Sequence, residues 1–87
     1  MITLTIGGSC YFETVRDGLV PCVMIAPTPR PASEHAIHGV TLRVTRNGHT
    51  GYKAGDLIET TPRHAIPRAA VRRRKYSTII LPYTVES

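Results

Sequence analysis

Apolar and polar residues alternate in two parts of the chain, and a period of two is typical of a half-buried β-strand. The first segment spans residues 2–6, where two threonines separate three aliphatic side chains. The second spans residues 40–44 and has the clearest alternation, because Val40, Leu42 and Val44 are separated by polar residues. Apolar segments without strict alternation predict further strands over Val20–Ile25, Leu57–Thr60 and Ser77–Val85.

Glycine and asparagine residues mark the ends of these expected strands. Gly7-Gly8 ends the first strand, and Ala54-Gly55-Asp56 predicts a turn into the strand over 57–60. Asn47-Gly48 is a pair that favours positive φ at both corners of a tight turn. We therefore expect a hairpin after the 40–44 strand, with its second arm reaching Tyr52.

Proline restricts two other segments. Pro21 limits the 20–25 segment to a sheet edge or to the beginning of a strand. In Ala26–His38, three prolines alternate with small and polar residues, which favours an extended surface loop that cannot join a central ladder. We expect this loop to lie on the surface of a single domain.

Helices are expected to be few and short. Ser9 can cap a helix of about two turns from Cys10 to Asp17, with Gly18 at the C-cap position. Near the C-terminus, Pro67 can open a second helix, but Ala70–Tyr76 fits a strand equally well. Both alternatives stay open for this segment.

These elements predict a mostly β (α+β) protein over residues 1–87: a small, partly open β-barrel of about five or six short strands with one or two short helices. A domain near this size buries only about 60% of the surface that its unfolded chain exposes. With no tryptophan and one phenylalanine, aliphatic side chains must supply most of that burial.

The longest apolar stretch is far shorter than the roughly 20 residues of a membrane span, and the N-terminus lacks the pattern of a secretory signal. We therefore expect an intracellular, cytoplasmic protein without a membrane partner.

Charge is distributed very unevenly along the chain. Residues 1–60 hold five basic and five acidic residues, whereas residues 61–87 hold six basic residues and only Glu86 as an acidic one. The formal net charge of +5 therefore comes entirely from the C-terminal third. A local positive field of this kind is typical of a protein that binds phosphates or carboxylates. The candidate binding residues are Arg63, Arg68, Arg72, Arg73, Arg74, Lys75 and Tyr76, extended by Arg43, Arg46 and Lys53 around the expected hairpin.

Three segments, in the right order, resemble the PUA-like small barrels called ASCH domains, especially their short phage-type members. The opening Leu4-Thr5-Ile6 with Tyr11–Gly18 is similar to the first strand and helix of that family, which has a sequence close to YFEAVLSG. Gly39–Asn47 resembles its GKTFEIRKN strand, and Tyr52–Ile58 its F-x-V-G-D-x-L turn and strand. The resemblance covers about half of the chain and implies a PUA-like barrel.

The residues that line the cleft in the ASCH family are not matched. Some members bind RNA and a few hydrolyse modified nucleosides with a Lys, a Glu and an Arg of the central strand. The aligned positions here are Val40, Arg43 and Thr45. The resemblance therefore implies that the barrel is retained without the cleft chemistry.

The remaining polar residues do not form a recognisable catalytic or metal-binding motif. Two cysteines and four histidines are present, but no pair has a CxxC or HxxxH spacing, and no glycine-rich phosphate loop occurs. Nothing brings a nucleophile, a base and a stabiliser of developing charge together. We expect no enzymatic activity, no metal, no cofactor and no small-molecule substrate.

Three interpretations of the basic cluster remain. The first is binding to the backbone of RNA or DNA, since arginine matches phosphate and tyrosine offers a stacking surface. The second is a phage-type accessory or inhibitory protein that docks on an acidic surface of a host protein or nucleoprotein complex, where arginine is enriched among hot-spot residues. The third is a solvated face that binds nothing. We favour nucleic-acid binding.

Overall fold

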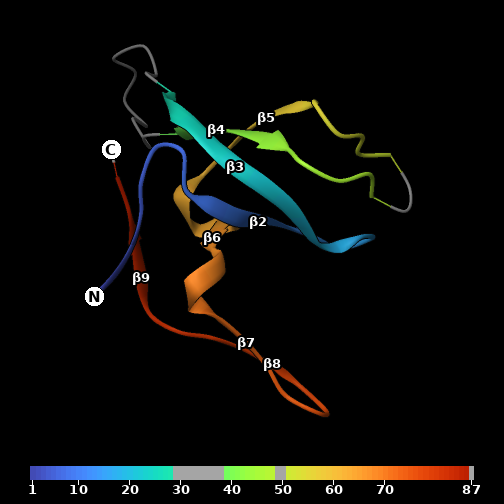
Figure 1. Ribbon diagram of the computed structural model, residues 1–87, viewed down its shortest axis with the longest axis vertical. Helices are drawn as coiled ribbons and strands as arrows, with labels where there is room; N and C mark the ends of the chain where they lie inside the picture. The colour runs from blue at the N-terminus through green and yellow to red at the C-terminus, as the bar shows by residue number, and fades with distance from the viewer. Residues whose placement is uncertain (29–38, 49–50, 87) are drawn as a thin grey trace.

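The computed structural model describes residues 1–28, 39–48 and 51–86. These residues are mostly β-strand and contain no α-helix, which confirms the expected mostly β class. Two single-turn 3₁₀ helices, η1 (Pro62–His64) and η2 (Arg68–Ala70), are the helical elements of this part of the chain. The strands form one five-stranded sheet and two two-stranded sheets (Figure 1). Within the described ranges, no helix is long and apolar enough to cross a membrane.

The largest sheet is antiparallel, with the strand order β5-β4-β3-β2-β6. Its strands, in chain order, are β2 (Ser9–Thr14), β3 (Gly18–Thr28), β4 (Gly39–Val44), β5 (Leu57–Thr60) and β6 (Ala65–Pro67). Two of these strands confirm the expected pattern: β4 contains the strand predicted over 40–44, and β5 coincides with the one predicted over 57–60.

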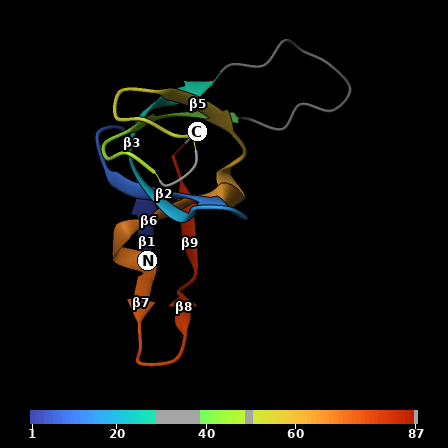
Figure 2. The same cartoon turned by 90° about the vertical axis from the view of Figure 1, so that its right-hand side faces the viewer.

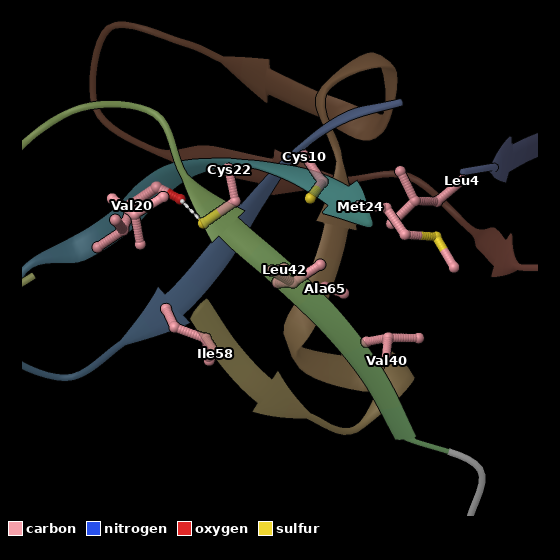
Figure 3. Close-up of a cluster of buried hydrophobic side chains, with 10 residues drawn as sticks. Leu4, Cys10, Val20, Cys22, Met24, Val40, Leu42, Ile58 and Ala65 are labelled. Atoms are coloured by element: carbon pink, nitrogen blue, oxygen red, sulfur yellow. Dashed lines mark hydrogen bonds between the residues drawn. The ribbon is translucent and has the colours of Figure 1, made fainter. Parts of the chain in front are cut away.

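One face of this sheet forms the core, because its alternate side chains point to the same side. Leu42 of β4 lies opposite Met24 of β3 and Ile58 of β5, and both Leu42 and Met24 are completely buried. Figure 3 shows how these side chains converge from several strands. Burial of apolar area at about 25 cal/mol per Å² stabilises this arrangement. The core cluster is Leu4, Cys10, Val20, Cys22, Met24, Val40, Leu42, Val44, Ile58 and Ala65.

The short segment that connects the two edge strands, β5 and β6, requires the five-stranded sheet to curl. In a flat sheet, β5 and β6 would lie four strand spacings apart, about 19 Å. The five residue steps from Thr60 to Ala65 span at most about 18 Å when fully extended, and the η1 turn between them shortens that reach. The sheet is therefore strongly curved, as Figure 2 shows. Its described edge strands are not paired with each other, so they do not close into a barrel.

The two ends of the chain lie side by side. β1 (Ile2–Leu4) and β9 (Tyr83–Val85) form a parallel pair in which Leu4 is opposite Val85. The backbone N–H of Glu86 donates to the carbonyl of Leu4 at 2.9 Å, and Leu4 itself is buried in the core. The predicted first strand is thus confirmed over Ile2–Leu4, whereas Ile6 lies beyond it and is exposed.

The ambiguous C-terminal segment is neither one helix nor one strand. After η2, β7 (Val71–Arg73) pairs antiparallel with β8 (Thr78–Ile80), the strand that begins the expected extended segment. Leu81 and Pro82 then separate β8 from β9. This confirms the expected restriction of pairing by Pro82.

The predicted helix over Cys10–Asp17 is wrong, because residues 9–14 form strand β2. β2 is hydrogen-bonded on both sides, to β3 and to β6, and this pairing determines the conformation of a short segment that contains two aromatic residues. Gly18 does adopt a positive φ of 64°, but in the β2–β3 turn rather than at a helix end. There the Thr14 hydroxyl accepts from the Asp17 N–H (2.8 Å) and donates to the Gly18 carbonyl (3.1 Å).

The expected position of Pro21 at an edge is also wrong, because β3 lies between β2 and β4. Pairing with β4 begins only at Cys22, which is opposite Val44. The Pro21 carbonyl accepts from the N–H of Thr45 (2.9 Å), beyond the end of β4. In an antiparallel strand, the backbone N and O of one residue face the same neighbouring strand. The Pro21 nitrogen, which has no proton to donate, therefore faces β4 at the point where the β3–β4 ladder ends.

The expected loop over Ala26–His38 is wrong at its beginning. Residues 26–28 continue β3 and pair with residues 39–41 of β4, after a register shift between Met24 and Ala26. A bulge of this kind bends a strand and interrupts its ladder locally, and prolines are found at such places. The rest of this expected loop, residues 29–38, lies outside the described residues.

The hairpin expected at Asn47-Gly48 is wrong in its turn only. In the described chain, positive φ occurs only at Gly7, Gly18 and Gly55, so the Asn47-Gly48 pair does not form the expected tight turn. The Gly48 N–H does donate to the Tyr52 carbonyl at 2.6 Å, so the expected second arm lies next to Gly48. β4 pairs instead with β5, across the intervening loop. The turn predicted at Ala54–Asp56 is confirmed: Gly55 has a φ of 96°, and the Asp56 carboxylate accepts from the N–H of Lys53 at 3.0 Å.

Candidate functional site

The most prominent surface feature is the hairpin formed by β7, β8 and the connection between them. We call residues 71–80 the basic arm. In its ladder, Arg72 is opposite Ile79 and Arg73 is opposite Thr78. The Arg74 N–H donates to the Ser77 carbonyl (2.8 Å) at the tip, and the Leu81 N–H donates to the Ala70 carbonyl (2.8 Å) at the base. The arm projects away from the five-stranded sheet in both views (Figures 1 and 2).

The positive charges of the basic arm are exposed and not neutralised by neighbouring carboxylates. All residues from Arg72 to Ile80 are exposed, and Tyr76 at the tip is 89% accessible. Within the described ranges, the recorded ion pair joins His64 to Glu13 at 3.8 Å and involves no residue of the arm. Four adjacent cations without counter-charges produce a local positive potential that attracts anions.

The two faces of the basic arm have different environments, because cross-strand partners share a face. Arg73 and Thr78 occupy the face toward β2, where the Arg73 guanidinium carbon lies 5.7 Å from the ring centroid of Tyr11. This distance is within the range of a cation–π contact. Arg72 occupies the other face and donates from Nη1 to the carbonyls of Ala69 (2.6 Å) and Val71 (3.1 Å). Arg73 therefore links the arm to the sheet.

A small pocket lies next to Tyr11 on the outer side of the sheet. Its volume is about 170 Å³. Arg46 follows β4, whereas Arg68 begins η2, and the fold brings these residues to the same pocket. None of its lining residues is acidic, and three carry hydroxyl groups: Ser9, Tyr11 and Thr45. Arg73 over Tyr11 adds a third basic residue beside this pocket, and Arg46 is distant in sequence from the other two.

Two neutral thiols line the inner side of this pocket. Cys10 and Cys22 are directly opposite each other on β2 and β3, and each is only 2% exposed. Burial raises the pKa of Cys10 to about 12 and that of Cys22 to about 11. Both thiols therefore stay protonated at neutral pH and add no negative charge to the pocket. Neither is joined to a metal-binding group: clusters of three or more His, Cys, Asp or Glu residues are absent from the described residues.

A larger cleft lies between the β2–β3 turn and the basic arm. Its volume is about 460 Å³, and Thr78 and Ile80 of the arm form one wall. The Glu13–His64 ion pair lies at this cleft. Next to it, the Tyr83 hydroxyl donates to the Arg63 carbonyl at 3.0 Å, and burial together with the Glu13 charge raises the pKa of Tyr83. No sequence motif predicts this cleft, because Glu13 lies within the segment predicted as a helix over Cys10–Asp17.

The structure places the predicted binding residues in several locations. Arg72, Arg73, Arg74, Lys75 and Tyr76 are on the arm, while Arg46 and Arg68 line the small pocket. Arg43 is exposed on β4, Lys53 lies in the loop before β5, and Arg63 lies in η1. These last three residues are not part of the arm and do not line the small pocket. Sequence reasoning missed Tyr11, Ser9 and Thr45. Tyr11 was placed in the predicted helix and Ser9 at its cap, and nothing local brings Thr45 next to them.

No protein-family model matches this chain, and no curated protein or solved structure matches it either. The arm and the pocket beside it are therefore the features from which a function can be inferred.

Proposed function

We propose that the protein binds the backbone of RNA or DNA through the basic arm and that it has no catalytic activity. The observation that carries this proposal is the group of uncompensated cations on a projecting hairpin. The major groove of B-DNA admits a two-stranded β-ribbon. The two-stranded arm can therefore enter the major groove of a DNA duplex, and it can also lie against a single-stranded nucleic acid. Affinity comes from Arg68, Arg72, Arg73, Arg74 and Lys75, with a smaller contribution from Arg46.

The composition of the arm favours phosphate as the ligand. Arginine offers planar bidentate donors that match a phosphate group, and charge-assisted hydrogen bonds of this kind are about twice as strong as neutral ones. Tyr76 is almost fully accessible at the tip and offers a face on which an unpaired base can stack. Lys53 and Arg63 lie away from the arm, so they contribute little in this proposal.

The curled sheet also supports a proposal about the fold. We propose that it is the wall of a partly open barrel, whose gap is bordered by β1 and β9. The short link between the two edge strands supports this view. Membership of the ASCH group remains a prediction, and its expected helix is a strand here.

A salt titration tests the nucleic-acid proposal. The full chain is mixed with a fluorescent 20-base-pair DNA duplex or a single-stranded RNA, and the dissociation constant is measured from 50 to 300 mM salt. If four to six side chains meet phosphates, log affinity falls against log salt with a slope of roughly −3 to −5. A slope near zero for both probes would contradict the proposal.

A second candidate function is docking on an acidic surface of a host protein or nucleoprotein complex. The observation that favours it is the pair Ile79 and Ile80 on β8, which stay 40% and 38% exposed beside the cationic strand. Exposed apolar side chains next to arginines are typical of protein interfaces. A pull-down with and without nuclease distinguishes the candidates: a protein retained after nuclease supports docking, and loss of all bound material supports nucleic acid.

A further inference from the structure

We propose that the small pocket lined by Arg46, Arg68 and Tyr11 binds a single phosphate group. This inference rests on the proposed function and adds to it a defined position for one phosphate of the ligand. The pocket is distinct from the tip of the arm, where the cations are spread along an open surface. It is built on the five-stranded sheet, whose hydrogen bonds hold its walls in place.

The charge balance of the pocket favours an anion. Arg46 and Arg68 line it, the Arg73 guanidinium stands over Tyr11, and none of the lining residues is acidic. The thiols of Cys10 and Cys22 are protonated at neutral pH, and burial raises the pKa of both further. Like charges at close range repel one another, and a bound anion removes that repulsion. The pocket is therefore lined by two basic residues and no acidic one, and a third basic residue lies against its Tyr11 wall.

Hydrogen-bond donors are available as well. The hydroxyls of Ser9, Tyr11 and Thr45 line the same pocket, and hydroxyl groups are common phosphate ligands. The Thr45 backbone N–H donates to the Pro21 carbonyl (2.9 Å), which holds the Thr45 backbone beside β3 at the edge of the pocket. Arginine adds planar, paired donors that match the oxygens of a tetrahedral oxyanion.

The size of the pocket limits what can occupy it. Pockets for drug-sized ligands are typically about 300–1,000 Å³, whereas this one is about 170 Å³. It accommodates one tetrahedral phosphate but not a whole nucleotide.

The bound phosphate can come from two places in a nucleic acid. An internal phosphodiester carries a nucleoside on both sides, whereas a terminal phosphate monoester carries one on a single side.

The first test uses inorganic phosphate as the probe. The full chain is titrated with phosphate at constant ionic strength, and the Nε–Hε signals of the arginines are followed by NMR. We expect saturable shifts at Arg46 and Arg68 in the native chain. In the double variant Arg46→Gln/Arg68→Gln, phosphate binding followed at the backbone amides of Ser9, Tyr11 and Thr45 should be weakened at least tenfold. The control variant Arg16→Gln/Lys53→Gln removes two exposed charges elsewhere and should bind like the native chain. Equal binding by the two variants, or shifts confined to the arm, would overturn the inference.

The second test uses oligonucleotides that carry a 5′-phosphate or a 5′-hydroxyl. If the pocket holds an internal phosphodiester, both oligonucleotides lose about tenfold in affinity in the Arg46→Gln/Arg68→Gln variant. If it holds a terminal phosphate, only the 5′-phosphorylated oligonucleotide does. No loss with either, while arm variants still weaken binding, would reject the pocket and leave the proposed function intact. No binding of either oligonucleotide by the native chain, with saturable phosphate binding, would reject the proposed function and leave the pocket.

Discussion

The five-stranded sheet and the basic arm use β-structure in opposite ways. In the sheet, β3 and β4 have partners on both sides, and their inward side chains are completely or nearly completely buried. The arm consists of two strands that pair only with each other in the described chain, and its side chains from Arg72 to Ile80 are all exposed. An isolated two-stranded hairpin is only marginally stable in water. The sheet therefore holds the fold together, whereas the arm is available for contact with a partner.

The largest expected effect of this division concerns the stability of the sheet. Leu42→Ala removes a completely buried side chain at the centre of the core, and we expect a loss of about 2–5 kcal/mol in the free energy of unfolding. Leu57→Ala is the matched control on the neighbouring strand, because Leu57 is 63% exposed. We expect a change within about 0.5 kcal/mol there. Urea unfolding of both variants measures the difference, and equal losses would contradict the position of the core.

The next effect concerns the charges of the arm. Arg72→Gln/Arg74→Gln/Lys75→Gln should weaken binding of a 20-base-pair duplex by about 10- to 100-fold, which is about 1.4–2.8 kcal/mol, with little change in stability. Arg16→Gln/Lys53→Gln/Arg63→Gln removes three charges from other places and is the matched control. Fluorescence anisotropy at constant salt compares the two. An equal loss in both triple variants would mean that net charge, rather than the arm, attracts the ligand.

A third prediction concerns the two thiols between the sheet and the pocket. Burial raises the pKa of both Cys10 and Cys22 above the ordinary value of 9.0. The folded state therefore keeps two protons that the unfolded chain releases above pH 9. This stabilisation is fully present below pH 9 and is lost as the pH rises toward the folded-state values, by about 1.4 kcal/mol per pH unit for each thiol.

Urea unfolding at pH 8, 9 and 10 measures this loss. The variant Cys10→Ala/Cys22→Ala serves as the control, since it has a lower stability at pH 8 but lacks both ionisable groups. We expect its free energy of unfolding to change much less between pH 9 and 10 than that of the native chain. Parallel declines in the two proteins would show that the thiols do not cause the alkaline loss of stability.

The smallest effect concerns the contact that joins the two regions. Tyr11→Leu removes the ring beneath Arg73, which should cost about 0.5–1 kcal/mol of stability, as expected for an exposed cation–π contact. Tyr76→Leu is the control, because its ring lies at the tip, 89% exposed, and is contacted by the neighbouring Lys75 side chain. Faster backbone motion of the arm, measured by ¹⁵N relaxation, is expected for Tyr11→Leu alone. Unchanged arm dynamics would show that Arg73 does not anchor the arm.

The sequence was sufficient for strands with clear alternation and insufficient for segments whose structure depends on distant partners. Val40, Leu42 and Val44 alternate with polar residues, and that period alone predicts β4. Cys10–Asp17 is short enough to fit a helix or a strand, and pairing with β3 and β6 decides for the strand. Pro21 was expected at an edge, but its position just beyond the end of β4 could not be deduced from local sequence.

The candidate site shows the same limit. The basic cluster was visible in the sequence, because charge is a local property of the chain. The convergence of Arg46 and Arg68 beside Tyr11 was not, since it depends on where the end of β4, the η2 turn and β2 meet in the folded chain. Had residues 10–17 been recognised as a strand, the alternation of Cys10 with Tyr11 would have placed the tyrosine on the outer face.

The division between a folding sheet and a binding arm is tested most directly by mapping the contact surface on the native protein. ¹H–¹⁵N spectra are recorded while a 20-base-pair duplex is added at low salt, and the shift of every assigned amide is measured. We predict that the largest chemical-shift changes occur at amides of the arm, with further changes around Tyr11. The signals of buried amides in β3 and β4 should not shift. Shifts centred on β5 or on the loop before it, or no shifts at all, would contradict the account.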